Sequence, residues 1–239
     1  MRGDASFPAT LSVGGSPVPL LVRRSSRARR LTLRACGPSR SIRLTLPSRM
    51  PAAMALRFLA DQGGWLEAQV AARFAAPAPF LPGGLLRLAD EDFALVVAPV
   101  RRVVRADPQL LVPADDPERF NAAVVGFVQR QARRLLSVEA REMARGIGRE
   151  VAALRIGDPR SRWGSCSAGG RLAFSWRLVL APGFVRRSVV AHEVAHLVHM
   201  DHGAEFHRLA DALSGGAHDR ARAWLRANAH QLHRQGRFD

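Results

Sequence analysis

The feature that most constrains this chain is the segment His192-Glu193-Val194-Ala195-His196, which holds two histidines four residues apart. On an α-helix, residues at this spacing lie on one face, one turn apart, so both imidazoles can reach a single metal ion. Four apolar residues precede the segment and predict a buried helix over about residues 182–198: Phe184, Val185, Val189 and Val190. Two imidazoles in a buried helix need polar partners. The pattern therefore predicts a metal site built on a helix, and the alternative is a pair of hydrogen-bonded or surface histidines.

Glu193 follows the first histidine directly and lies about 100° around the helix from His192. Its carboxylate can therefore act on a water molecule beside the metal without being a ligand itself. A structural metal site has no need of this carboxylate and usually takes four protein ligands, often thiolates. The position of Glu193 favours a catalytic site.

A catalytic zinc site needs a third protein ligand, and three histidines follow the helix: His199, His202 and His207. Three ligands from His192 to His199 on one straight helix would spread over about 10 Å. They could not close around one ion with bonds near 2 Å. His202 can join the pair if the chain turns after Val198, and Met200-Asp201-His202-Gly203 is typical of such a turn. His207 could reach back from a following helix. For His202 and for His207, the alternative is an ordinary surface position.

The rest of the chain reads as groups of strands followed by helices. Residues 30–35 and 42–46 alternate apolar and polar side chains with the period of a half-buried sheet. Further strands are predicted at residues 20–23, 85–88, 94–98, 101–104, 110–112, 151–156 and 171–176. Helices are predicted at residues 50–74, 117–146, 204–213 and 217–234. This order predicts an α+β fold. We place a boundary before a helix start at 116, which gives an Arg-rich, β-rich region with one helix over 1–115 and a second domain over 116–239.

The charge of the chain is concentrated near its beginning. The formal net charge is +16, and ten arginines but no acidic residue lie between Ala5 and Ala60. Such a block attracts polyanions. Few aromatic residues are interleaved with these arginines, so any contact with nucleic acid would be to phosphates rather than to stacked bases. Nucleic acid is therefore one candidate partner of this region, and a solvated outer face of a sheet explains the block equally well.

Several functional classes are not supported. No apolar stretch approaches the roughly 18 residues of a membrane span, and residues 1–19 lack the pattern of a secretory leader. The two cysteines, Cys36 and Cys166, do not form a disulfide framework, and we expect Cys166 to be a structural thiol. We expect a soluble cytoplasmic protein without a membrane partner. The sequence gives no prediction of the oligomeric state.

A longer pattern resembles the bacterial YgjP-like metallopeptidase family, whose members are related to the SprT and WLM zinc proteases. The matching segments are 160–167 (RSRWGSCS), 174–178 (FSWRL), 181–182 (AP), 192–197 (HEVAHL) and 202–206 (HGAEF). Gly203 and His207 stand where many YgjP-like members have Ser and Trp. With Gly203, the dipeptide His202-Gly203 is similar to the His-Gly pair of the SprT proteins.

This resemblance implies a zincin-like metallopeptidase domain over residues 116–239. The zinc ligands would be His192, His196 and His202, and Glu193 would be the catalytic base. It also implies an extended strand at Trp163–Ser167, along which a peptide or protein substrate can pair.

We therefore predict a zinc-dependent metallopeptidase. One alternative is a DNA-associated, SprT-like protease that acts on DNA-bound or crosslinked proteins, which the positive charge would permit. Another is a non-catalytic zinc-containing binding module. Arg162 and Arg177 could bind a carboxylate or an oxyanion, and surface ion pairs are the alternative for both.

Overall fold

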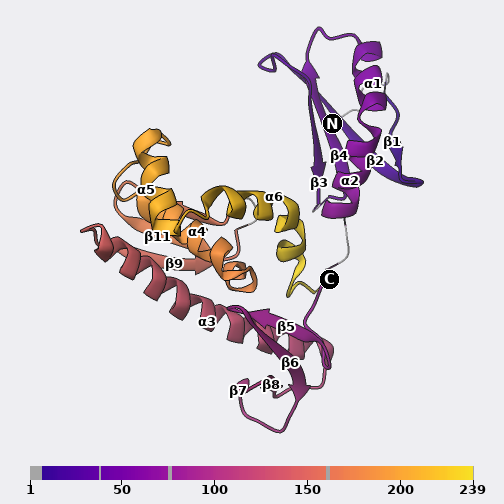
Figure 1. Ribbon diagram of the computed structural model, residues 1–239. Coiled ribbons are helices and arrows are strands. Elements are labelled where there is room, and N and C mark those ends of the chain that lie inside the picture. Colours follow the sequence, from indigo (N-terminus) through magenta and orange to yellow (C-terminus); the bar gives the residue numbers. More distant parts are fainter. Residues whose placement is uncertain (1–6, 38, 75–76, 160–161, 239) are drawn as a thin grey trace. The chain divides into compact units, whose positions relative to one another are not determined.

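The computed structural model describes residues 7–37, 39–74, 77–159 and 162–238. Arg160 and Ser161 of the family-like pattern lie outside these residues. The chain divides into two compact units, Met1–Ala76 and Pro77–Asp239 (Figure 1). Both units combine mixed sheets with helices, so the predicted α+β class is confirmed. Within the described ranges, no helix is both long and apolar enough to cross a membrane.

The first unit contains a four-stranded sheet and two helices. Its strands are β1 (Thr10–Val13), β2 (Ser16–Ser25), β3 (Thr32–Cys36) and β4 (Ser41–Pro47), in the spatial order β1-β2-β4-β3. The central pair β2–β4 is parallel and the two outer pairs are antiparallel. One face of the sheet contributes Leu20, Ile42 and Leu44 to a core that also contains Ala55 and Leu59 from the first helix.

The single helix predicted over residues 50–74 is in fact two helices, α1 (Ala52–Asp61) and α2 (Gly63–Arg73). The break falls at Gln62, whose φ of −97° and ψ of 13° depart from helical values. Gly63 and Gly64 follow immediately, and glycine is costly in a helix interior because it loses the most conformational freedom on folding. The prediction of one continuous helix was therefore wrong at this point.

The second unit opens with a sheet of the same connectivity. Its strands are β5 (Leu85–Leu88), β6 (Glu91–Val97), β7 (Val104–Ala106) and β8 (Gln109–Val112), in the order β5-β6-β8-β7. Again the central pair is parallel and the outer pairs are antiparallel. A proline stands at the end of each four-stranded sheet: Pro47 is the last residue of β4, and Pro113 directly follows β8. A second proline comes four residues later, at the beginning of the next helix: Pro51 before α1 and Pro117 in α3. The topology therefore repeats in a sequence that has no obvious internal repeat.

A long helix, a small sheet and three further helices complete the second unit. They are α3 (Pro117–Gly146), β9 (Ala153–Gly157), β10 (Gly164–Cys166), β11 (Arg171–Ser175), the short 3₁₀ helix η1 (Trp176–Leu180), α4 (Gly183–Ala195), α5 (Ala204–Ser214) and α6 (His218–Arg234). The sheet has the order β10-β11-β9, with β10 at an edge. The predicted histidine helix is α4, which packs against α3, α5, α6 and β10 (Figure 1).

The boundary expected at residues 115 and 116 lies inside the second unit. Strands β5 to β8 share one hydrophobic core with α3 and η1: Leu86 and Leu110 are buried together with Phe120 and Leu178. This shared apolar core joins residues 77–115 to the part of the chain that follows.

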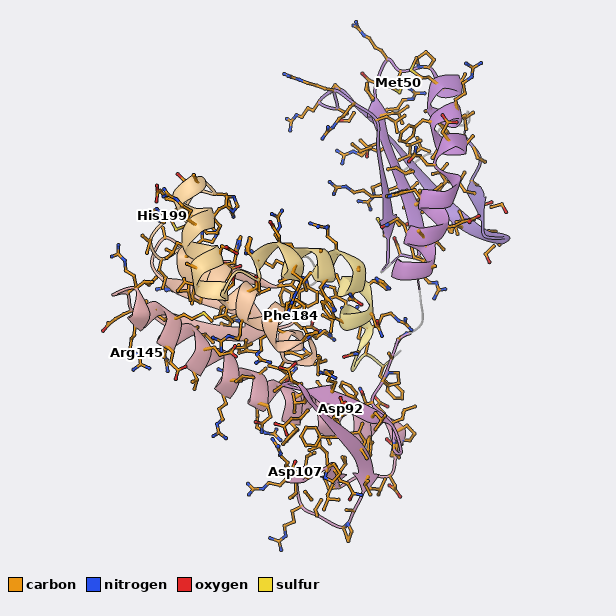
Figure 2. The ribbon with its side chains drawn as sticks, viewed as in Figure 1. Met50, Asp92, Asp107, Arg145, Phe184 and His199 are labelled. Carbon is orange, nitrogen blue, oxygen red and sulfur yellow. The ribbon has the colours of Figure 1, made fainter. Side chains whose placement is uncertain are left out.

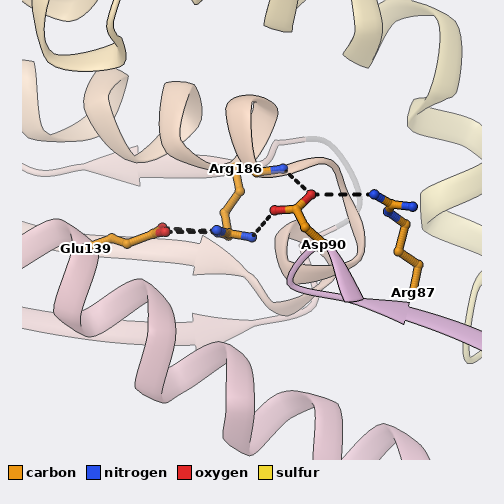
Figure 3. Close-up of polar contacts among 5 residues, drawn as sticks. Arg87, Asp90, Glu139 and Arg186 are labelled. Carbon is orange, nitrogen blue, oxygen red and sulfur yellow. Dashed lines mark hydrogen bonds and ion pairs between the residues drawn. The ribbon is translucent and has the colours of Figure 1, made fainter. Parts of the chain in front are cut away.

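Buried ionic contacts fix the beginning of α4 (Figure 3). The Arg186 side chain is 8% exposed, and its Nε donates to both carboxylate oxygens of Glu139 on α3, at 3.1 and 3.2 Å. A second nitrogen of Arg186 lies 3.7 Å from Asp90, in the turn between β5 and β6. Asp90 also accepts a 2.9 Å hydrogen bond from the backbone N–H of Gly183, the first residue of α4. The network ties α3, α4 and the β5–β6 turn together.

Replacing Glu139 with alanine is expected to lower the free energy of unfolding of the second unit by about 3 kcal/mol, because Arg186 would be left buried without its main partner. The control is Glu142→Ala, an exposed glutamate on the same helix, which should change stability by less than about 0.5 kcal/mol. Denaturant unfolding followed by tryptophan fluorescence measures both variants. A Trp65→Phe background leaves tryptophans only in the second unit. Equal effects of the two substitutions would contradict the proposed role of the network.

Candidate metal centre

Three histidines converge at the end of α4. His192 lies in the last turn of the helix, His196 is its C-terminal cap, and His202 lies two residues before α5. One ring nitrogen from each of the three lies within 4.8 Å of the other two. The Nε2 atoms of His192 and His202 are 3.4 Å apart. The structure thus brings together the three histidines that the family resemblance implied.

The convergence depends on where α4 ends. The sequence pattern predicted a helix to residue 198, but α4 stops at Ala195. The next amides form turns that continue from the helix: Leu197 N–H donates to Val194, and the N–H groups of Val198 and His199 both donate to Ala195. Turns therefore continue the chain from α4 through His199, and the short segment that follows brings His202 back to His192.

His199 and His207 are placed differently. His199 lies between α4 and α5 (Figure 2). Its backbone oxygen contacts the ring of His196, one of the three converging histidines. The His196 Nδ1 is 2.9 Å from this oxygen and donates a hydrogen bond to it. The proton on Nδ1 leaves Nε2 of His196 with a free lone pair. His207 is exposed, and its ring centroid is 6.3 Å from that of His202.

The protonation state of His192 suits a metal ligand. Burial, together with the neighbouring histidines His196 and His218, lowers its pKa to about 4. The imidazole is therefore neutral at pH 7 and has a lone pair available, as metal binding requires.

Glu193 is 7% exposed and lies against the backbone of β10. A Cβ atom at Gly164 would fall 2.5 Å from Cγ of Glu193, so only glycine leaves room for the carboxylate in this position. Burial raises the pKa of Glu193 to about 7, and the positive charge of Arg162 acts in the opposite direction. A cation beside the carboxylate would lower this pKa again, since an opposite charge favours the ionised form.

Two contacts of Trp163 hold the beginning of β10. The Trp163 ring, directly before the strand, stacks on His233 of α6 with centroids 4.4 Å apart. The backbone oxygen of Trp163 accepts a 2.8 Å hydrogen bond from Ser175. Within the strand, the pKa of the Cys166 thiol is raised by burial and by the charge of Glu193. The thiol is therefore protonated at neutral pH, which favours a structural role for Cys166.

Arg177 does not serve the histidine group. Its side chain is 1% exposed, pairs with Asp158 and donates from Nε to the backbone oxygen of Gln235 at 3.1 Å. Its guanidinium also lies 4.1 Å from the centre of the Trp176 ring. Of the two alternatives for Arg177, the ion pair is the one observed, but it is buried rather than on the surface.

His218, the first residue of α6, is a further histidine beside the group that the sequence did not predict. It is 7% exposed, and its ring is parallel to that of His192 with centroids 5.6 Å apart. Its buried Nδ1 has no hydrogen-bond partner among the described residues. Burial lowers the pKa of His218, so this ring is also uncharged at pH 7. No spacing rule connects a residue at the start of α6 with a motif on α4, so sequence alone gave no signal.

The donor set fits a zinc ion of the catalytic kind. Three imidazole nitrogens with one open position form a common arrangement for catalytic zinc. The backbone carbonyl of His199 accepts a hydrogen bond from Nδ1 of His196, and metal-binding histidines are usually oriented by such a bond from their other ring nitrogen. The arrangement, with a buried glutamate beside it, is that expected of a metallopeptidase.

Comparison with known proteins agrees with this class. A family model described as the YgjP-like metallopeptidase domain matches residues 29–228. The match spans most of the chain and includes the whole histidine group, so the chain belongs to the YgjP-like family. The resemblance noted in the sequence is confirmed, and the domain is a metallopeptidase whose substrates are peptides or proteins. No curated protein and no solved structure matches the chain.

Proposed function

We propose that this protein is a zinc-dependent metallopeptidase in which His192, His196 and His202 hold the ion and Glu193 is the catalytic base. The observation that carries the proposal is the approach of three imidazole nitrogens to within 4.8 Å of one another, next to a buried carboxylate. When bound, zinc supplies Lewis acidity, which acidifies water and polarises a peptide carbonyl.

Glu193 accepts a proton from the attacking water and delivers it to the amine nitrogen that leaves. Its carboxylate lies close against the backbone of Gly164, where a side chain at that position would clash with it. A catalytic group that is already positioned in the free enzyme avoids the entropy cost of being oriented during the reaction. The close packing of β10 against α4 therefore supports the role of Glu193.

The edge position of β10 supports a binding mode for the substrate. In the described sheet β10 pairs with β11 alone, so its other edge is not paired with a strand. An extended peptide can add to such an edge by backbone hydrogen bonds. Because Gly164 of β10 contacts Glu193, a peptide bound there passes close to the catalytic base.

A specific observation also favours nucleic acid as a partner of the first unit. Arg34 lies directly opposite Arg43 in the antiparallel β3–β4 pair, and Arg23 is on the same face of β2. All three are exposed, and nitrogen-tipped side chains extend from the sheet face opposite α1 and α2 (Figure 2). Like charges directly opposite each other are destabilising. Phosphates bound on this face would relieve that repulsion, so we propose that the peptidase acts on proteins bound or crosslinked to DNA.

Zinc-loaded Glu193→Gln protein is expected to lose about 10²–10⁴-fold in peptide hydrolysis, because glutamine has nearly the same shape but cannot accept the proton. Its zinc content should equal that of the wild type. Glu205→Gln, at an exposed glutamate in the first turn of α5, serves as the control and should retain full activity. Unchanged turnover in Glu193→Gln would exclude Glu193 as the base.

The third ligand is tested by zinc affinity, measured by competition with a chelating dye. His202→Ala should weaken zinc binding by at least about tenfold, because one of three ligands is removed. His199→Ala should have little effect, because the His199 backbone oxygen, which remains in alanine, is the group that contacts His196. If only the His199 substitution weakens binding, the proposed ligand set is wrong.

Binding of duplex DNA should weaken with salt, with a slope of log K against log salt near −0.9 for each neutralised phosphate. The triple variant Arg23→Gln, Arg34→Gln and Arg43→Gln should reduce that slope and leave the zinc content unchanged. The control removes three exposed arginines of the second unit: Arg141, Arg145 and Arg149. Absence of DNA binding at low salt, or an equal effect of the control, would exclude the sheet face as the DNA-binding surface.

A further inference from the structure

The candidate ligands His192 and His196 are held by different kinds of contact. Nδ1 of His196 donates to the backbone oxygen of His199, which fixes the orientation of that ring. Among the described residues, the only polar contact of the His192 ring is the one between its Nε2 and Nε2 of His202. Within the same residues, Nδ1 of His192 therefore has no acceptor that would hold the ring. The orientation of His192 depends on contacts of another kind.

Phe206 supplies one of these contacts and is shared by all three ligands. It is fully buried in the first turn of α5. Its ring centroid lies 4.8, 4.4 and 4.7 Å from those of His192, His196 and His202, respectively. It meets the His192 ring at an interplanar angle of 80°, edge to face. The terminal torsion of a histidine side chain has a broad minimum, so one edge contact defines the plane of the His192 ring only weakly.

His218 supplies the contact that defines this plane. The rings of His192 and His218 are parallel to within 1°, with centroids 5.6 Å apart. The rings of His196 and His202 meet His192 at 85° and 35° instead. Offset parallel stacking is a favoured arrangement of aromatic rings, and rotation of the His192 ring would lose it.

The fold places His218 at this position through the turn between α5 and α6. Gly215 and Gly216 have φ angles of 67° and 74°, in the left-handed region that glycine adopts without strain. They end α5 and allow α6 to begin at His218, two residues later. The His218 side chain is buried, and α6 packs against α4. A ring carried by a packed helix is a well-defined support for a metal ligand.

His218 acts on His192 through the face of its ring. Its Nδ1 is buried and has no hydrogen-bond partner among the described residues. The ring is also not part of the ligand group, since within those residues only His192, His196 and His202 bring nitrogens within 4.8 Å of one another. A phenyl ring could therefore replace this imidazole without breaking a hydrogen bond of Nδ1.

We propose that His218 is a positioning residue, whose ring stacks on His192 and holds that imidazole in the plane in which its Nε2 meets the other ligands. The proposal rests on the ligand set proposed above and assigns a role to a residue outside it. Loss of an outer contact to a ligand typically weakens metal binding about 10–100-fold. The lower end of this range is expected here, because Phe206 remains in contact with His192.

Two substitutions separate the flat ring of His218 from its bulk. His218→Phe keeps a ring at this position, whereas His218→Leu fills the space with a branched side chain that has no flat face. The matched control is His207→Leu, at an exposed histidine of α5 whose ring lies 6.3 Å from that of His202. In competition with a chelating dye, His218→Leu should bind zinc about tenfold more weakly than the wild type. His218→Phe and the control should stay within about threefold of the wild type.

The visible absorption of the cobalt-loaded proteins gives a second readout, because at saturating metal it reports ligand geometry independently of affinity. The wild-type bands should be shifted or weakened in His218→Leu and retained in His218→Phe and in the control. Thermal unfolding of the metal-free proteins shows whether the fold has changed, and all variants should unfold close to the wild-type temperature. If the phenyl ring does not fit and His218→Phe unfolds early, the comparison of His218→Leu with the control still decides.

Wild-type zinc affinity and a wild-type cobalt spectrum in His218→Leu would overturn the proposal. Equal losses in the folded Leu and Phe variants would also overturn it, because the nitrogen rather than the ring would then be required. The peptidase function fails separately. A wild type that binds zinc and hydrolyses no peptide would contradict that function, whereas weaker zinc binding by His218→Leu would still support the role of His218. A wild type that binds no zinc would contradict the ligand set and, with it, both proposals.

Discussion

The candidate metal site depends on the residue at which α4 ends. Three imidazoles along one straight helix cannot meet at a single ion, because each residue advances the chain by about 1.5 Å. The helix stops at Ala195, and the turn that follows returns His202 to within 3.4 Å of His192. The same turn supplies the His199 carbonyl that orients the His196 ring. One helix terminus therefore both completes the group of three nitrogens and sets the tautomer of one of them.

The rest of the second unit holds that helix in place. At its beginning, α4 is tied to α3 and to the β5–β6 turn through Arg186, Glu139 and Asp90. Along its length it is buried against α3, α5 and α6, and β10 lies against Glu193 with glycine at the point of contact. A site carried by packed elements keeps its geometry better than one carried by mobile loops.

Much of this arrangement follows from local sequence patterns. The spacing of His192 and His196 predicts two ligands on one helical face, and the apolar stripe of residues 117–146 predicts α3 with its observed bounds. Features set by distant contacts were not predicted. The position of His218 beside His192 and the repeated strand order depend on packing between segments far apart in the chain. The split between α1 and α2 has a local cause, because Gly63 and Gly64 are the first residues of α2.

X-ray absorption spectroscopy of the zinc-loaded protein tests the central claim most directly, because it reports the atoms bound to the metal. The account predicts imidazole nitrogens as the protein ligands at about 2.0–2.1 Å, with one lighter oxygen ligand and no sulfur. A sulfur neighbour at about 2.3 Å would place Cys166 in the site, since no other described cysteine lies in the second unit. Four imidazole nitrogens would fill the position that a catalytic site keeps open. Either result would contradict a three-histidine catalytic centre.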